Sequence, residues 1–168
     1  MYSNQSNMVN ANTQTMASIF DPLTDLYNRH LFLQVSNSLL KISLRQRMPV
    51  SVAMVSLEHV SDTAHLEIDE AQEIIKQSAD LLKSITRDSD TLSHFDDYVF
   101  GLLLYNCTYQ QSHIVANRIN AKLEGRLSFR NQPVTIAIGL AEFDRNFADN
   151  QHLSEHMVEE ALSDMGRR

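Results

Sequence analysis

Residues 87–104 read RDSDTLSHFDDYVFGLLL and contain two short apolar runs, Thr91–Phe95 and Val99–Leu104. The joint between these runs, Asp96–Tyr98, is acidic and only three residues long. Two strand-like runs separated by two or three turn-prone residues predict a β-hairpin, although Asp-Asp is a weaker turn signal than Asn-Gly. Carboxylates at a hairpin tip can serve phosphate or metal chemistry, and they are equally typical of an ordinary solvated turn.

The apolar pattern on either side of this hairpin predicts helices mixed with strands. Helical spacing predicts helices over about 25–46 and 67–86, a third that begins at Thr108, and a short last one over 154–165. Strand-like runs lie at 50–57 and 132–140. The order is helix, strand, helix, hairpin, helix, strand, helix, which predicts an α+β fold with helices packed against a sheet.

The apolar faces of these helices are expected to include Ile42 in the first, Ile68 in the second and Ile114 in the third. Asp21 or Thr24 is expected to cap the first helix, because both residue types are favoured before a helical pattern.

Bulk composition favours one soluble domain. Of the 168 residues, 43% are hydrophobic and 21% charged, which is normal for a soluble globular protein, so we expect a single domain over 20–168. The N-terminal stretch is rich in Asn, Ser, Gln and Thr, so we expect a flexible leader or linker over 1–19. The net charge of −7 argues against nucleic-acid binding, yet it leaves room for a local basic pocket. The single cysteine fits a cytoplasmic protein without a disulfide, and no run is long enough to span a membrane. The seven histidines form no HExxH motif and no Cys/His cluster, and His152 and His156, four residues apart, are an adventitious zinc pair at most.

Three stretches resemble the GGDEF (diguanylate cyclase) domain family. DPLTDLYNRHLF, from Asp21 to Phe32, resembles its DPLTGLxNRRxF entry helix, with Asp25 in place of glycine. VTIAIGLAEF at 134–143 is similar to the VTxSxGVA strand, and VAMVSLEHV at 52–60 occupies the place of LxLxDLDHF. The resemblance implies the nucleotidyl-cyclase palm, a ferredoxin-like fold with a central, mostly antiparallel sheet flanked by helices.

The same resemblance implies a chemistry. Members of the family join two GTP molecules into cyclic di-GMP, with one GTP held by each half of a dimer. Carboxylates would hold divalent ions that neutralise the triphosphate and activate the attacking 3′-hydroxyl.

The hairpin departs from the family signature. With Phe100 aligned to the terminal Phe, the five residues DDYVF stand where the family has GGDEF. Asp96 and Asp97 then replace the two glycines, Tyr98 replaces the acidic metal ligand, and Val99 replaces the following glutamate. Glycines let the backbone approach a nucleotide closely, whereas two carboxylates there would repel a triphosphate.

The preceding strand departs as well. Ser56 replaces the first Asp of the family's DxD metal motif, and Glu58 keeps the second carboxylate. Serine and tyrosine are poor ligands for Mg²⁺, which prefers carboxylate and phosphate oxygens. We therefore expect a degenerate domain with no catalytic residues, no metal and no cofactor.

A rival register slides the signature by two residues. It puts His94–Tyr98 on GGDEF, so that Asp96 and Asp97 replace the acidic pair. A shift of two keeps the strand faces, so periodicity does not exclude it. The corresponding hypothesis is an active cyclase, with a metal site rebuilt from Glu58, Asp96 and Asp97. Of the hypotheses, it requires the largest number of missing family residues to be compensated.

In the first register an inhibitory site survives. RDSD at 87–90 falls on the family's RxxD motif, and ANRI at 116–119 falls on its AERI helix, with no gap between the two matches. The resemblance implies that Arg87, Asp90 and Arg118 bind cyclic di-GMP as a regulatory ligand. Arginines bind phosphates bidentately and stack on purines, and an aspartate accepts from a guanine edge.

Two functions from different classes follow. The first is a cyclic di-GMP receptor that uses Arg87, Asp90 and Arg118. The second is a nucleotide-independent scaffold, in which the RxxD residues form only a surface salt bridge or a cap. Such a scaffold would form a homodimer or dock onto a signalling or phosphodiesterase module.

Overall fold

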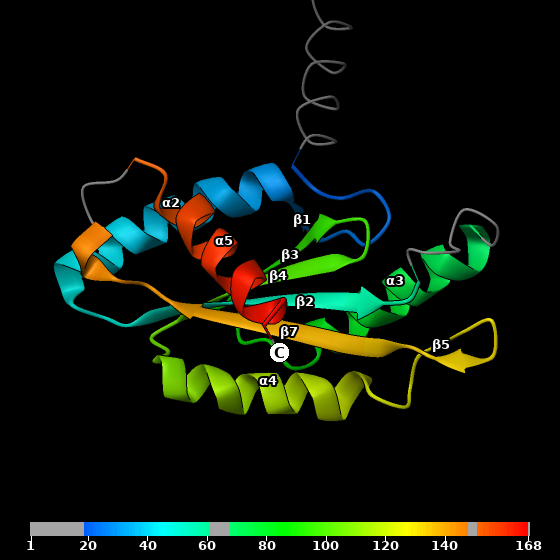
Figure 1. Ribbon diagram of the computed structural model, residues 1–168. Coiled ribbons are helices and arrows are strands. Elements are labelled where there is room, and N and C mark those ends of the chain that lie inside the picture. The colour runs from blue at the N-terminus through cyan, green and yellow to red at the C-terminus, as the bar shows by residue number, and fades with distance from the viewer. Residues whose placement is uncertain (1–18, 61–67, 148–150, 168) are drawn as a thin grey trace, which may run out of the picture.

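The computed structural model describes residues 19–60, 68–147 and 151–167 (Figure 1). The expected leader therefore lies outside the described residues up to residue 18. In the part that is described, no helix is long and apolar enough to cross a membrane.

Five strands form the central sheet, in the order β1-β3-β4-β2-β7. Their bounds are β1 Tyr27–Asn28, β2 Val50–Glu58, β3 Thr91–Asp96, β4 Val99–Tyr105 and β7 Thr135–Glu142. β1 runs parallel to β3, and every other neighbouring pair is antiparallel. This confirms the expected α+β palm, because β2-α3-β3-β4-α4-β7 follows the ferredoxin-like βαββαβ order.

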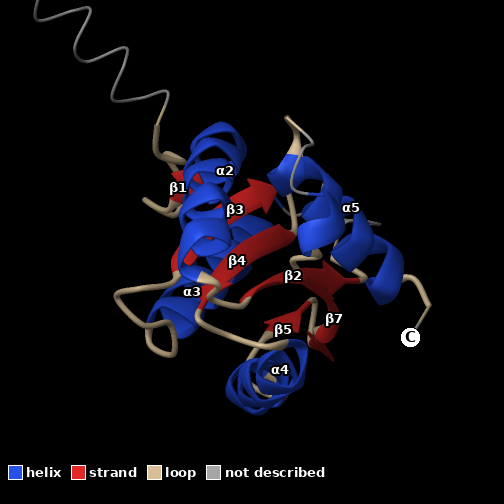
Figure 2. Cartoon of the chain, turned by 90° about the vertical axis from the view of Figure 1, so that its left-hand side faces the viewer, coloured by secondary structure: helices blue, strands red, loops and turns tan. Residues whose placement is uncertain are grey.

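Two helices cover each face of the sheet, as Figure 2 shows. One face carries α2, Arg29–Gln46, and α5, Leu153–Met165; the other carries α3, Ile68–Lys83, and α4, Tyr109–Leu123. A 3-10 turn, η2 at Arg145–Phe147, precedes α5, and a two-stranded hairpin, β5 Ser128–Phe129 with β6 Gln132–Pro133, precedes β7.

β2 lies between two hydrophobic cores. Ala53, Val55 and Leu57 face the core under α3 and α4, whereas Val52 and Met54 face the core under α2 and α5. All five are at most 1% exposed, and burial of each large side chain contributes about 1.5–3 kcal/mol. Burial on both faces explains why this strand reads as an almost continuous apolar run.

The start of the first helix differs from the prediction. α2 begins at Arg29, and its cap is Asn28, whose side chain accepts a hydrogen bond from the Leu31 amide at 2.9 Å. Asp21 and Thr24 lie in the preceding turn and do not cap the helix. Asp25 has φ 57°, a left-handed conformation that no helix can include.

The predicted helix faces were wrong at three residues. Ile42, Ile68 and Ile114 are 42%, 59% and 66% exposed. Serines occupy several of the buried positions instead: Ser36 and Ser43 in α2, Ser78 in α3 and Ser112 in α4. The Ser43, Ser78 and Ser112 hydroxyls donate to carbonyls of their own helices, so these polar residues can be buried. A prediction that follows only apolar residues does not recognise such buried positions.

The strand predicted over 132–140 is two strands. β6 ends at Pro133 and β7 begins at Thr135, and β5, which the sequence pattern did not predict, pairs with β6. Arg130 and Asn131 connect them with φ of 51° and 60°, as a type I′ hairpin loop requires. The predicted start of the third helix at Thr108 is confirmed, because Thr108 and Gln111 form a capping box.

Candidate functional site

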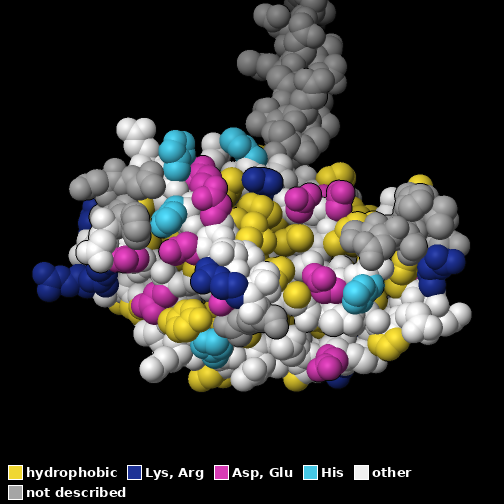
Figure 3. Space-filling view, viewed as in Figure 1, with side chains coloured by type: hydrophobic (Ala, Val, Ile, Leu, Met, Phe, Trp, Pro, Cys, Tyr) yellow, Lys and Arg dark blue, Asp and Glu magenta, His cyan; other side chains and the backbone are white. Residues whose placement is uncertain are grey.

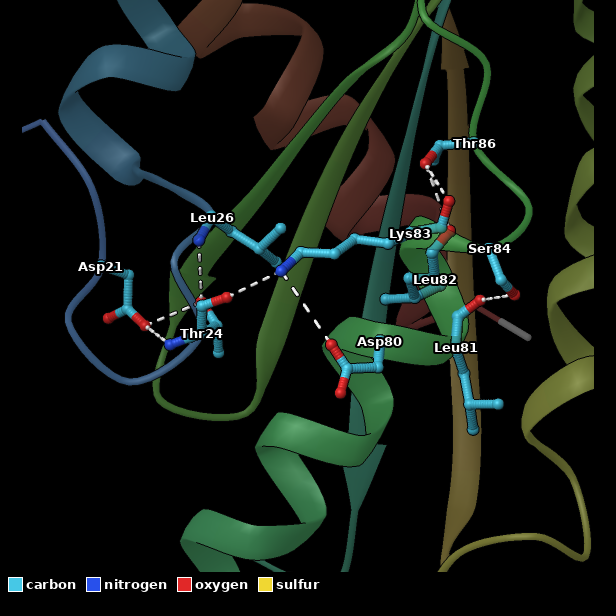
Figure 4. Close-up of polar contacts among 9 residues, drawn as sticks. All are labelled: Asp21, Thr24, Leu26, Asp80, Leu81, Leu82, Lys83, Ser84 and Thr86. Atoms are coloured by element: carbon cyan, nitrogen blue, oxygen red, sulfur yellow. Dashed lines mark hydrogen bonds and ion pairs between the residues drawn. The ribbon is translucent and has the colours of Figure 1, made fainter.

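The entry turn, residues 20–28, leads into α2 and is held by side-chain hydrogen bonds to Thr24 (Figure 4). The Asp21 carboxylate accepts from the Thr24 amide and the Thr24 hydroxyl, both at 2.8 Å. Lys83, the last residue of α3, donates from Nζ to the Thr24 carbonyl at 3.1 Å. The entry turn is therefore tied to the end of α3.

His94 connects the entry turn to the hairpin tip. Its Nδ1 lies 3.0 Å from an Asp21 carboxylate oxygen, and its Nε2 lies 3.1 Å from the Asp97 carbonyl oxygen. Both partners of the ring are oxygen atoms, one from the entry turn and one from the hairpin tip. Burial alone would raise the pKa of Asp21, but hydrogen bonds from Thr24 and His94 outweigh it and lower this pKa.

The tip itself is a two-residue loop, Asp97-Tyr98, after a bulge between His94 and Asp96. Asp96 and Asp97 are exposed, and the Asp96 carboxylate accepts from the Asp97 amide at 2.9 Å. The described backbone of residues 96–99 has no positive φ, so side chains fit here without strain. Burial, together with the Asp97 carboxylate, raises the pKa of Tyr98, so its phenol stays protonated near neutrality.

Two of the strand positions that depart from the family signature, one in β2 and one in β4, are direct neighbours across the sheet. Ser56 of β2 is the register partner of Val99 in β4, and the Leu57 amide donates to the Tyr98 carbonyl at 2.9 Å. Glu58 ends β2, opposite Thr135 of β7. A serine and a valine are thus paired at positions where the resemblance implies carboxylates.

The remaining carboxylates do not assemble. Among the residues that the structure describes, which include Glu58, Asp96 and Asp97, no three His, Cys, Asp or Glu side chains are grouped so that they could hold a metal ion.

The second candidate site is a hollow of about 190 Å³ beside the start of β3 and α4. Its walls include all three predicted inhibitory-site residues, Arg87, Asp90 and Arg118. The structure thus brings together one arginine and one aspartate from the turn before β3 with an arginine from the middle of α4. Both arginines are exposed, and Asp90 is half-buried.

Each of these residues also has a local structural contact. The Asp90 carboxylate accepts from the Arg87 amide at 3.0 Å, and the Asp90 amide donates to the Arg87 carbonyl at 3.0 Å. The Arg118 guanidinium donates from Nη2 to the Ile85 carbonyl at 2.8 Å. These contacts fix the turn before β3 against α4.

The floor of the hollow was not predicted. Tyr105, the last residue of β4, contributes to it together with Asn106 and Cys107, which follow the strand. Burial raises the pKa of the Cys107 thiol, Asp90 adds to the rise, and Arg87 opposes it. No spacing rule identifies this floor, because Arg87 lies in the turn before β3, outside the paired strands, and Cys107 comes after the end of β4.

Comparison with known proteins identifies the family. Residues 18–168 match the family model described as the GGDEF domain of diguanylate cyclases. The chain belongs to the GGDEF domain family. None of the curated proteins matches it significantly.

Solved structures of GGDEF domains share this fold. The FimX GGDEF domain from Pseudomonas aeruginosa is 21% identical with a TM-score of 0.76, over 90% of this chain and 93% of that one. The DgcB GGDEF domain from Caulobacter crescentus, solved in complex with c-di-GMP, is 15% identical with a TM-score of 0.77, over 89% and 86%. The diguanylate cyclase SiaD from Pseudomonas aeruginosa, in complex with its activator SiaC, is 22% identical with a TM-score of 0.75, over 97% and 63%.

Proposed function

We propose that this GGDEF domain is catalytically inactive and acts as a receptor for cyclic di-GMP, which it binds with Arg87, Asp90 and Arg118. The observation that carries the proposal is the hollow of about 190 Å³, into whose walls two separate segments bring these three residues. A related fold, the DgcB domain, was solved with c-di-GMP bound, which makes this ligand class the natural one to test.

The chemistry of the hollow fits a cyclic dinucleotide. Two guanidinium groups can bind phosphates bidentately or stack on a purine, and Asp90 can accept from the N–H groups of a guanine edge. Leu104, Ile114 and Val115 give the same hollow an apolar wall for a base. Two cations against one carboxylate make the lining locally positive on a protein of net charge −7.

Several features of the former cyclase site support inactivity. Ser56 and Val99 lie opposite each other, and neither is a carboxylate. Tyr98 is a neutral phenol, and the exposed Asp96 and Asp97 would repel a triphosphate at the tip. Mg²⁺ prefers carboxylate and phosphate oxygens, so these positions cannot supply the ligands that two-metal phosphoryl transfer needs.

Calorimetry with two ligands tests both parts of the proposal. Titration of cyclic di-GMP should release heat and give a dissociation constant below roughly tens of micromolar. Incubation with GTP and Mg²⁺ should give no cyclic di-GMP product. Arg87→Ala should abolish the heat, whereas Arg126→Ala, which removes an exposed arginine outside the hollow, should leave it unchanged. Product formed from GTP would refute inactivity, and absence of cyclic di-GMP binding would refute the receptor.

The second candidate is a nucleotide-independent scaffold, and the local contacts of the same residues favour it. Asp90 fixes its own turn and Arg118 holds the Ile85 carbonyl, which gives both residues a purely structural role. Such a domain would act in the cytoplasm as a homodimer or docked onto a signalling or phosphodiesterase module. Light scattering with and without cyclic di-GMP separates the candidates, because only a receptor would respond to the nucleotide.

A further inference from the structure

A groove of about 170 Å³ lies on the opposite face of the sheet from the RxxD hollow, where α2, the hairpin tip and α5 meet. Its floor is apolar and combines Leu33, Phe95, Val99 and Val158. In Figure 3, hydrophobic side chains gather on this face between α2 and α5, with acidic side chains on both sides of them. The groove is separate from the residues proposed to bind cyclic di-GMP.

Part of the apolar surface is open to solvent. Leu162 of α5 lines the groove and is 39% exposed, which is high for a large aliphatic side chain at the rim of an apolar floor. Phe95 in the floor is itself buried, and the Arg29 guanidinium lies 4.7 Å from the centre of its ring. The positive charge of Arg29 is therefore held against an aromatic face at one end of the groove.

The rim is acidic. Asp96, Glu155 and Glu159 line the groove, against a single guanidinium from Arg29. Burial alone would raise the pKa of Glu155, but hydrogen bonds from its own amide and the Ser154 hydroxyl, with His152 beside it, lower this pKa. Three carboxyl side chains against one guanidinium make the rim acidic, which favours a cationic occupant.

We propose that this groove binds a basic amphipathic helix of a partner protein, which packs an apolar side chain against Leu162 and places lysines or arginines on Asp96, Glu155 and Glu159. An apolar floor between two helices is the usual setting for an amphipathic helix. Charge complementarity selects the occupant. The three carboxylates repel an anionic nucleotide, and a second copy of this chain, with a net charge of −7, is a poorer electrostatic match for the rim than a basic segment.

A designed peptide is the probe. It is a fluorescein-labelled helix of about 15 residues made of Lys and Leu, with Leu at i, i+3, i+4 and i+7. Two controls have the same length: one replaces every Lys by Glu, and the other keeps the composition but scrambles the apolar stripe. Fluorescence anisotropy with the full chain at about 150 mM salt, where distant charges are screened, should show binding of the amphipathic basic peptide only.

Matched variants locate the binding site. Glu159→Lys should weaken binding about tenfold, whereas Glu124→Lys, the same charge change at an exposed residue beyond the end of α4, should change it less than about twofold. Leu162→Ala should also weaken it several-fold, and because this residue is already partly exposed the variant should remain folded.

Equal weakening by the two charge reversals, tight binding of the scrambled peptide, or indifference to Leu162→Ala would overturn the proposal. Full displacement of the peptide by an equal concentration of spermidine would also overturn the proposal, because it would show that the rim binds small cations rather than a helix. Cyclic di-GMP titrated into Glu159→Lys should give the wild-type affinity, so the outcome at the groove is independent of the RxxD hollow.

Discussion

Replacing Gly139 by alanine is expected to destabilise the domain strongly, because α5 crosses β7 at this residue without room for a side chain. A Cβ atom at Gly139 would overlap the Ala161 carbonyl oxygen and lie 2.7 Å from the Met165 amide nitrogen. Ordinary Cβ contacts begin at 3.4 Å, so moving that nitrogen from 2.7 to 3.4 Å requires a shift of about 0.7 Å, and the Ala161 carbonyl must move further.

The shift is costly because backbone atoms are the obstacle. No rotamer change relieves it, so α5 must move as a unit and loosen the side chains it buries, among them Leu153, Met157 and Val158. Overpacking a core costs typically about 1–3 kcal/mol, and we place this backbone clash at about 3 kcal/mol. A domain with about 5–15 kcal/mol of stability remains folded after such a loss, so the effect can be measured at equilibrium.

Urea unfolding followed by far-ultraviolet circular dichroism measures the free energy, since the chain has no tryptophan to report by fluorescence. Gly166→Ala is the matched control, because a Cβ atom there would lie 3.9 Å from its nearest neighbours, the Leu162 and Ser163 carbonyl oxygens. The control should change stability by less than about 1 kcal/mol. Equal urea midpoints for the two variants would refute the described packing of α5 on β7, and with it the wall of the peptide groove.

Two further predictions concern the entry turn. Asp25→Gly should stabilise the domain by about 0.5–1 kcal/mol in the same urea assay, because Asp25 has φ 57° and glycine adopts this conformation without steric cost; a loss of stability would contradict the described turn. The lowered pKa of Asp21 contributes stability at neutral pH that is lost as pH falls below about 4, through its folded-state pKa. In Asp21→Asn the free energy of unfolding should therefore fall less steeply as the pH is lowered into the acid range. An unchanged pH dependence would show that the Thr24 and His94 contacts do not hold this carboxylate.

The sequence predicts most of the fold because hydrophobic patterns and local motifs carry it. The spacing of apolar residues predicts the long amphipathic helices and the apolar central strand. Thr108 predicts the start of α4, where it forms a capping box with Gln111. What the pattern misses has a physical cause. Ser43 is buried because its hydroxyl donates to a carbonyl of its own helix. The apolar pattern places the neighbouring Ile42 in the core instead, although Ile42 is exposed.

The candidate sites divide in the same way. The family resemblance identifies Arg87, Asp90 and Arg118 through their motifs, whereas the contribution of Cys107 depends on how the end of β4 packs beside them. The peptide groove depends instead on where α5 rests against the tip. Arg29, Asp96 and Glu159 come from three distant segments that no spacing rule connects, so only the packed structure brings them together.

The two sites differ in charge, and this difference decides what each can bind on a chain of net charge −7. At physiological salt the Debye length is about 8 Å, so a ligand responds mainly to the charges that line its own site. The hollow beside α4 presents two arginines and one aspartate, while the groove beside α5 presents three carboxylates and one arginine. Because helices of opposite faces carry them, an anionic nucleotide and a cationic helix can be bound at the same time. The acidic tip, which opposes a triphosphate, is the same feature that suits the groove to a basic partner.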